Sequence, residues 1–126
     1  RLAGVQPPED RVLDGVDILP VLTGKATAVE RPIPLYWRLD MAPYDLHLAL
    51  RRGDWKLLAS RDFQKFELYN LKNDPGETTN LRDKEPKIFQ ELREELARIN
   101  AQVEAEGPDW WKRLSPNGGL PPLKKK

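Results

Sequence analysis

The stretch GDWKLLASRDFQKFELYNLKNDPGETTNL, Gly53 to Leu81, decides the fold. It opens on the turn pair Gly53-Asp54, continues with strand-forming residues from Trp55 to Ala59, and alternates apolar with polar residues from Phe66 to Leu71. Such runs, bounded by turn residues, are typical of strands. In the N-D-P-G run of residues 73–76, proline presets a turn and glycine stands where a positive φ costs nothing. The stretch therefore predicts two antiparallel strands followed by a chain reversal.

Two further strands are expected upstream. The leucines of residues 46–50 alternate with other residues, which is the period of a half-buried strand and turns His47 away from the leucine face. Leu35 to Leu39 is rich in aromatic residues, and Pro32 and Pro34 before it favour a place at the edge of a sheet. The four runs together predict a small antiparallel meander.

One long helix is predicted after the turn. We expect Asp83 to cap it, Pro86 to lie in its first turn, and Gly107-Pro108 to end it after Glu106. Apolar residues recur at helical spacing, namely Ile88, Leu92, Leu96, Ile99 and Val103. This stripe should pack on one face of the sheet. The expected fold class is therefore α+β, a small antiparallel sheet of about four strands packed by one long C-terminal amphipathic helix.

The chain divides into three parts. Residues 1–12 contain Pro7-Pro8 and are expected to form an extended entry segment, residues 13–106 the α+β domain, and residues 107–126 a segment that Trp110-Trp111 pins at its start before a flexible tail rich in Pro, Gly and Lys. Within the domain, Asp17 is expected to cap a short helical turn that Gly24 ends in the left-handed conformation. With 126 residues, the chain has room for one modest core.

Composition excludes several classes of function. The 21 Lys and Arg against 20 Asp and Glu give a net charge of +1, and outside Lys124 to Lys126 both signs are interspersed, so nucleic acid is not an expected partner. Without cysteine, the chain can hold no disulfide, thiolate metal site or cysteine nucleophile. No apolar run approaches the roughly 18 residues of a membrane-spanning helix. Because the chain begins at Arg1 without methionine, we interpret it as a fragment of a longer protein.

Candidate catalytic and metal-binding residues are few. His47 is the only histidine, and one histidine without cysteine does not make a zinc site. Asp14 and Asp17 could bind a hard cation, but capping is the favoured interpretation. Ser60 and Ser115 are the only serines, and neither lies in a glycine-flanked elbow. We therefore predict no catalytic and no metal-binding residue within this chain.

The aromatic residues suggest an alternative. Tyr36, Trp37, Tyr44, Trp55 and Tyr69 lie on or beside the expected sheet, and flat rings stack on sugars. We favour a role for these rings in the core, since aromatic side chains dominate the burial energetics of small domains. A freestanding module that binds carbohydrate or protein through an aromatic sheet face remains the alternative function.

Four segments, followed by an amphipathic helix, carry a family resemblance. They are L-D-G-V-D-I-L-P-V-L-T-G-K (Leu13 to Lys25), R-P-I-P-L-Y-W (Arg31 to Trp37), A-L-R-R-G-D-W-K-L-L (Ala49 to Leu58) and E-L-Y-N-L-K-N-D-P-G-E-T-T-N-L (Glu67 to Leu81), of which the last is the most specific. Over roughly residues 13 to 105 the chain resembles the C-terminal subdomain of sulfatases of the arylsulfatase family.

The resemblance implies a supporting role. The catalytic α/β domain of the parent chain would be the partner, and it would carry the calcium ion and the formylglycine made from a C/S-x-P/A-x-R motif, which is absent here. A sulfated small molecule or glycan would be the parent's substrate. Trp37, Arg38, Tyr44 and His47 are expected as a possible substrate rim. The resemblance also implies a periplasmic or secreted protein, and an exposed docking face would allow self-association.

Overall fold

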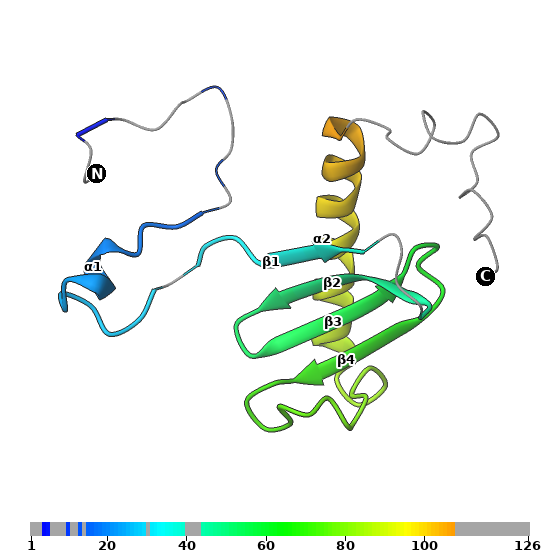
Figure 1. Ribbon diagram of the computed structural model, residues 1–126. Helices are drawn as coiled ribbons and strands as arrows, with labels where there is room; N and C mark the ends of the chain where they lie inside the picture. Colours follow the sequence, from blue (N-terminus) through cyan, green and yellow to red (C-terminus); the bar gives the residue numbers. More distant parts are fainter. Residues whose placement is uncertain are drawn as a thin grey trace, which may run out of the picture. The chain divides into compact units, whose positions relative to one another are not determined.

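The computed structural model describes residues 4–5, 10, 13, 15–29, 31–39 and 44–107. The chain divides into two compact units, residues 1–34 and residues 35–126 (Figure 1). The first contains a short helix, α1 (Leu19–Leu22), and the second contains a sheet and a long helix, α2 (Pro86–Glu106). Pro7-Pro8, Asp14 and the segment from Pro108 to Lys126, with Trp110-Trp111, lie outside the described residues.

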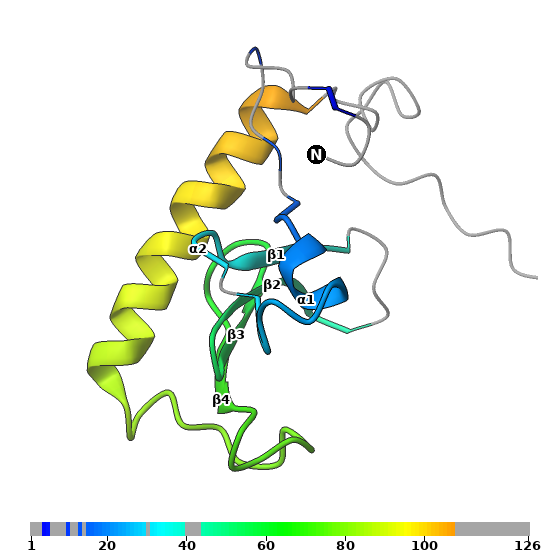
Figure 2. The same cartoon turned by 90° about the vertical axis from the view of Figure 1, so that its left-hand side faces the viewer.

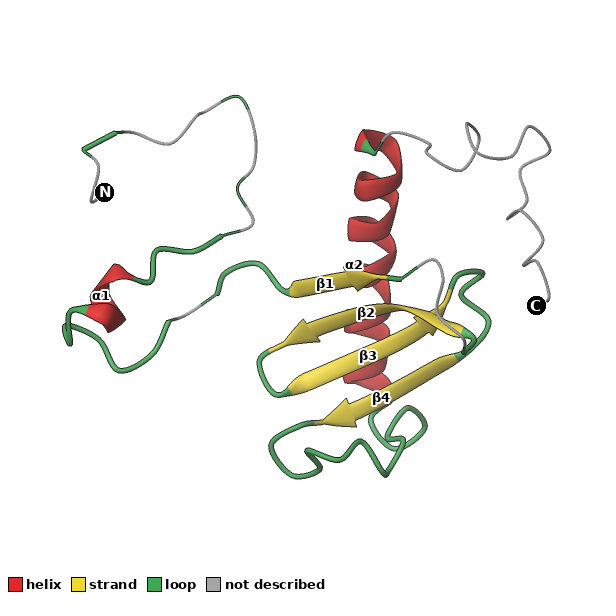
Figure 3. Ribbon diagram, in the orientation of Figure 1, coloured by secondary structure: helices red, strands yellow, loops and turns green. Residues whose placement is uncertain are grey.

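The sheet is a four-stranded antiparallel meander in the order β1-β2-β3-β4. The strands are β1 (Leu35–Arg38), β2 (Leu46–Arg52), β3 (Trp55–Ser60) and β4 (Phe66–Asn70). Helix α2 crosses one face of this sheet (Figures 2 and 3). The α+β prediction is confirmed, with four strands, β1 at an edge, and one long C-terminal helix.

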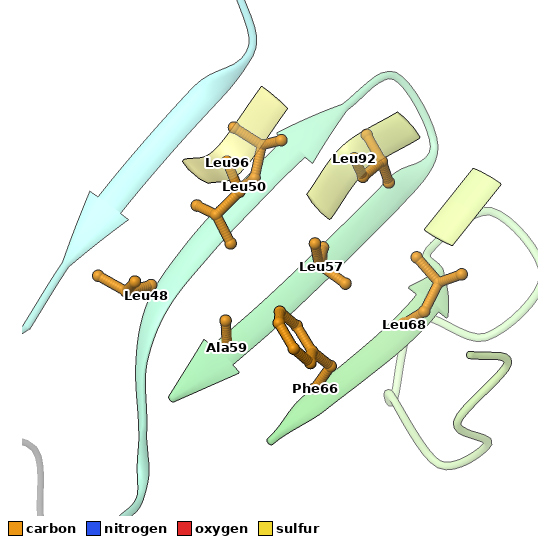
Figure 4. Packing of buried hydrophobic residues seen from close by; sticks show 8 residues of the cluster. All are labelled: Leu48, Leu50, Leu57, Ala59, Phe66, Leu68, Leu92 and Leu96. Carbon is orange, nitrogen blue, oxygen red and sulfur yellow. The ribbon is translucent and has the colours of Figure 1, made fainter. Parts of the chain in front are cut away.

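The core lies between the sheet and α2 (Figure 4). Alternate positions of β2, β3 and β4 face the middle of α2. The buried cluster consists of Leu48, Leu50, Leu57, Ala59, Phe66, Leu68, Leu92 and Leu96. Each fully buried leucine contributes about 1.5–3 kcal/mol relative to an exposed one. The period of two in the strands and the helical spacing in α2 thus converge on one apolar layer.

A bulge in β2 breaks the expected alternation. Leu46 pairs with Ser60 while Leu48 pairs with Ala59, so His47 has no partner of its own across the ladder. The prediction that Leu46 shares the leucine face was therefore wrong, because the extra residue shifts it out of phase with Leu48. Leu46 is only half-buried and lies outside the core cluster.

The turn after β4 forms where expected but with a different backbone. A positive φ of 55° is found at Glu77, and Gly76 does not adopt one. The reversal is held by Asp74, whose Oδ2 accepts hydrogen bonds from the backbone nitrogens of Thr78 (2.8 Å) and Thr79 (2.9 Å). The expectation of a left-handed Gly76 was therefore wrong. The hydrogen bonds to the Asp74 carboxylate hold the reversal, and Glu77 takes the left-handed conformation.

Helix α2 spans the predicted residues, with a different start. Pro86 lies in its first turn as expected, but Glu85 occupies the cap position and makes no side-chain cap bond. Asp83, the expected cap, lies two residues too early and accepts a hydrogen bond from Nε of Arg82 instead. The prediction that the apolar stripe packs on the sheet along its whole length was also wrong at its far end, since Val103 is 39% exposed.

The reason for the exposed end is geometric. A helix of 21 residues is about 31 Å long, whereas four strands about 4.8 Å apart span about 14 Å. The last turns of α2 therefore extend past β1 (Figure 1).

Helix α1 is a single turn, as predicted, but Ile18 and not Asp17 occupies its cap position, and no side-chain cap bond is made there. Oδ1 of Asp17 accepts a hydrogen bond from the backbone nitrogen of Leu19 (3.0 Å), which is free of an intrahelical acceptor. Pro20 lies in the first turn, and Gly24 follows the helix with a φ of 70°. The side chains of Ile18 and Leu22 are largely exposed.

Candidate functional site

The predicted rim residues lie in the chain near the point where β1 ends and β2 begins. Arg38 pairs with Leu48, and the backbone nitrogen of Leu39 donates to the carbonyl oxygen of His47 (2.9 Å). Trp37 precedes this point and Tyr44 stands just before β2. The four candidates thus share one end of the β1–β2 pair, beside the connection of residues 40–43, which lies outside the described residues.

Strand alternation separates Trp37 from Arg38. Arg38 faces α2, since its guanidinium donates to Oε1 of Glu104 (3.2 Å). Trp37 points to the opposite side of the sheet and is 48% exposed. The two side chains therefore cannot contact one small ligand from the same side.

The side chain of Tyr36, like that of Arg38, points toward α2. Its hydroxyl donates to Oδ1 of Asn100 (2.8 Å), a side chain that is buried on α2. Sequence reasoning missed Asn100 as a buried residue, although it lies four positions after Leu96, at the helical spacing of the stripe. The hydroxyl and the amide satisfy each other and tie the edge strand to the helix.

His47 and Tyr44 lie in a charged neighbourhood. Tyr44 is largely exposed, and Nδ1 of His47, which is half-buried, lies 2.9 Å from the carbonyl oxygen of Asp45. The carboxylate of Asp45 forms an ion pair with Lys65. The hydrogen bond and the charge of Lys65 lower the pKa of Asp45, and the same contact raises the pKa of Lys65. At neutral pH this end of the sheet therefore presents fixed charges of both signs.

Most of the described aromatic side chains pack within the domain. Tyr36 and Trp55 pack against the core, as the favoured interpretation predicted. Tyr69 is buried, and its hydroxyl donates to Oε2 of Glu67 (2.8 Å). Burial together with this carboxylate raises the pKa of Tyr69 to about 12. Of the rings proposed for sugar stacking, Trp37 and Tyr44 are the exposed ones.

The described serine has a structural role. Oγ of Ser60 donates to Oδ1 of Asp62 (2.6 Å) and accepts from the backbone nitrogens of Gln64 and Lys65. The bond from Ser60 lowers the pKa of Asp62. Ser60 is 6% exposed, so it closes the β3–β4 turn and is not an accessible nucleophile.

The described part of the chain has neither a cluster of metal ligands nor a membrane-spanning helix. There, no three His, Cys, Asp or Glu side chains lie close enough together to hold a metal ion. Likewise, neither of the helices described combines the length and the apolar character that crossing a membrane requires.

Comparison with known proteins identifies relatives. Residues 1–102 match the family described as N-sulphoglucosamine sulphohydrolase, C-terminal. N-acetylgalactosamine-6-sulfatase of Mus musculus is 38% identical over 61 residues, and that of Rattus norvegicus is 36% identical over 61 residues. Each of these matches covers 44% of this chain but 11% of the relative.

A solved structure shares the fold. It is a sulfatase described in connection with the metabolism of multiple glycosaminoglycans by Bacteroides thetaiotaomicron. The likeness has a TM-score of 0.51 at 22% sequence identity, and it covers 80% of this chain and 22% of the solved one. The chain thus spans about a tenth of the length of the curated relatives and about a fifth of the solved chain.

Proposed function

Because the chain belongs to the N-sulphoglucosamine sulphohydrolase C-terminal family, we propose that it serves a parent sulfuric ester hydrolase as the domain that completes its fold. The family match over residues 1–102 carries this proposal, and the four-stranded sheet packed by α2 supports it. The domain is a C-terminal sulfatase domain, and we expect it not to catalyse alone. A freestanding binding module is not favoured.

The chemistry belongs to the remainder of the parent. The family resemblance implies a calcium ion and a formylglycine there, together with a catalytic α/β domain as the partner. The described residues do not fit either group, because the chain has no cysteine, Ser60 is engaged in a turn, and the described part lacks a cluster of metal ligands. No step of the hydrolysis is therefore assigned to the described residues.

The names of the relatives suggest a substrate class. The matching family is named for the N-sulfate of glucosamine, and the rodent relatives for the 6-sulfate of N-acetylgalactosamine. We infer that the parent hydrolyses a sulfate carried by an amino sugar.

Sulfate release tests this function. The full-length parent and the isolated 126-residue chain would each be incubated with N-sulfoglucosamine and with N-acetylgalactosamine 6-sulfate, and sulfate would be measured by ion chromatography. We expect release by the parent, none by the isolated chain, and none by a parent whose C/S-x-P/A-x-R cysteine or serine is replaced by alanine. Release by the isolated chain, or a parent inactive on both sugars, would contradict the proposal.

We also propose that Trp37, Arg38, Tyr44 and His47 border the substrate cleft of the parent. The exposed rings of Trp37 and Tyr44 support stacking on a sugar, and the position of His47 supports a hydrogen bond to it. Because Arg38 lies on the α2 side of β1 and Trp37 on the opposite side, Arg38 would contact a different part of the substrate, where it would bind a sulfate oxygen by exchanging Glu104 for it.

Alanine variants of the parent separate binding from stability. Loss of a hydrogen bond to a charged group costs about 1.5–3 kcal/mol, so we expect Arg38→Ala or His47→Ala to raise KM by about 10- to 100-fold. Glu104→Ala is the matched control for Arg38, since it breaks the same ion pair and leaves the cation. Unchanged KM values in Arg38→Ala and His47→Ala would refute the rim.

A further inference from the structure

Asn100 interrupts the apolar stripe of α2. It lies four residues after Leu96, where the helical repeat would place another leucine, yet it carries a polar amide and is only 7% exposed. Asparagine is a poorer helix former than leucine, and a buried amide loses its hydrogen bonds to water. The stability of α2 alone therefore does not explain the residue at this position.

The partner of this amide supplies an explanation. Oδ1 of Asn100 accepts a hydrogen bond of 2.8 Å from the hydroxyl of Tyr36 on β1. Within the described part of the chain, every buried side-chain nitrogen and oxygen has a hydrogen-bond partner, so the amide is satisfied where it lies. A hydrogen bond fixes both the distance and the direction between two groups, whereas apolar burial is non-directional. The bond thus sets where β1 lies against α2.

β1 is the strand for which such a bond matters most. The buried cluster takes its residues from β2, β3, β4 and α2, and β1 adds the partly buried ring of Tyr36 (Figure 4). β1 is also the first strand in the order of the sheet, with β2 as its neighbour. Its position against α2 therefore depends on directional contacts more than on buried apolar area.

The bond lies directly beside the proposed substrate rim. Arg38 follows Tyr36 by two positions, so the two side chains share one side of β1. Its partner Glu104 follows Asn100 by about one helical turn. Trp37 stands between Tyr36 and Arg38 and points to the other side of the strand. A displacement of β1 along α2 would therefore move both rim residues of this strand.

We propose, on the basis of the proposed function and its substrate rim, that Asn100 and Tyr36 are positioning residues. Their hydrogen bond holds β1 against α2 and thereby aims Arg38 at the sulfate of the substrate, without either residue touching it. The bond is buried at Asn100, whereas the carboxylate of Glu104 is about half exposed. Arg38 can therefore exchange Glu104 for a sulfate oxygen while the strand stays in place.

A double substitution separates position from stability. Replacing both partners of a buried hydrogen bond by apolar groups is nearly neutral for folding, whereas replacing one leaves the other unsatisfied. In the full-length parent, Tyr36→Phe/Asn100→Leu should keep the melting temperature and kcat but raise KM for the sugar sulfate about 3- to 10-fold. Ile88→Leu is the control, since this partly buried residue lies near the start of α2, and its KM should not change.

Removal of Arg38 shows whether the pair acts through it. Arg38→Ala alone and Arg38→Ala combined with Tyr36→Phe/Asn100→Leu should then have the same KM, because a cation that is absent cannot be misplaced. KM effects that multiply would show that the pair acts by another route. An unchanged KM in the double variant, or in Arg38→Ala itself, would also overturn the proposed role of Asn100.

Hydrogen exchange gives a readout that needs no substrate. In the 126-residue chain, the double variant should exchange the amides of residues 35–39 about tenfold faster than the wild type, and those of β3 at the wild-type rate. If the parent releases no sulfate from either sugar, the proposed function fails, and faster exchange still supports the positioning of β1 by this bond. Equal exchange rates in β1 would overturn the positioning even in a parent that releases sulfate.

Discussion

Two glycines that sequence reasoning treated alike have different roles. Gly53 joins β2 to β3 with a φ of 59°, a region that L-residues rarely adopt, whereas Gly76 lies in the turn after β4 without a positive φ. Nothing lies within 4 Å of a Cβ built on Gly53, and a Cβ on Gly76 would lie 3.4 Å from Cγ2 of Thr78. Both sites thus have room for a methyl group, and only Gly53 has a backbone that opposes one.

Alanine substitutions should reveal this difference. Gly53→Ala is expected to destabilise the domain by about 1–2 kcal/mol because of the left-handed backbone. Gly76→Ala should change the free energy of unfolding by less than about 0.5 kcal/mol. Urea unfolding of the isolated chain measures both. Equal losses at the two positions would show that the left-handed backbone at Gly53 does not set the cost of the substitution.

Asp74 makes the turn after β4 sensitive to acid. Hydrogen bonds from the backbone nitrogens of Thr79 and Thr78 stabilise its carboxylate and lower its pKa from the ordinary value of an aspartate. A group with a lowered folded pKa contributes stability that is present above its unfolded pKa and is lost as pH falls through the folded pKa.

Asp74→Asn should therefore show a stability deficit that depends on pH. The difference from the wild type should be constant above about pH 5 and should shrink as the pH falls below about 4. Urea unfolding between pH 7 and the acid limit of the folded state measures it, with Glu106→Gln at the exposed end of α2 as a control for general charge effects. A deficit that stays constant across the range would exclude the carboxylate as its source.

At the scale of elements, the middle residues of α2 pack against the sheet, whereas the apolar stripe as a whole does not. Leu92 and Leu96 are fully buried against β2 and β3, and Asn100 binds Tyr36 of β1. Beyond Asn100 the ion pair between Arg38 and Glu104 is at the surface, where such pairs contribute little. The last turns of α2 therefore depend on helix propensity more than on packing.

Truncations along α2 should follow this gradient. Leu92→Ala is expected to cost about 2–5 kcal/mol because it leaves a cavity in the core. Val103→Ala should cost less than about 0.5 kcal/mol, although both residues belong to the same apolar repeat. Thermal unfolding of the isolated chain measures both. A comparable loss at Val103 would mean that the end of α2 is packed in solution.

For the whole molecule, the division into units has a consequence for folding. Every residue of the core cluster lies in the unit of residues 35–126, and the described residues of the unit 1–34 form one short helix, which has no buried residue. The stability of the sheet and α2 should therefore not require the first 34 residues.

We expect the segment 35–126, expressed alone, to keep the circular dichroism spectrum of the sheet and α2 and the melting temperature of the full chain. Limited proteolysis of the full chain should likewise cut before β1 and spare β1 to α2. If the shorter segment were unfolded, the first unit would have to supply part of the core.

The amino-acid sequence by itself determined the elements and the family. Local chemistry sufficed for this, since period-two runs, turn residues such as Gly53-Asp54 and the helical repeat from Ile88 to Leu96 act within short distances along the chain. Four segments in order, of which Glu67 to Leu81 is the most specific, indicated a sulfatase C-terminal domain, which the family match confirmed.

Only the tertiary structure decided which side chains face one another. The bulge at His47, the hydrogen bond between Tyr36 and Asn100 and the ion pair between Arg38 and Glu104 depend on cross-strand register and on where α2 crosses the sheet. These are contacts between segments far apart in the chain, and their geometry is set by packing the whole layer at once. For that physical reason no local pattern in the sequence could have placed them.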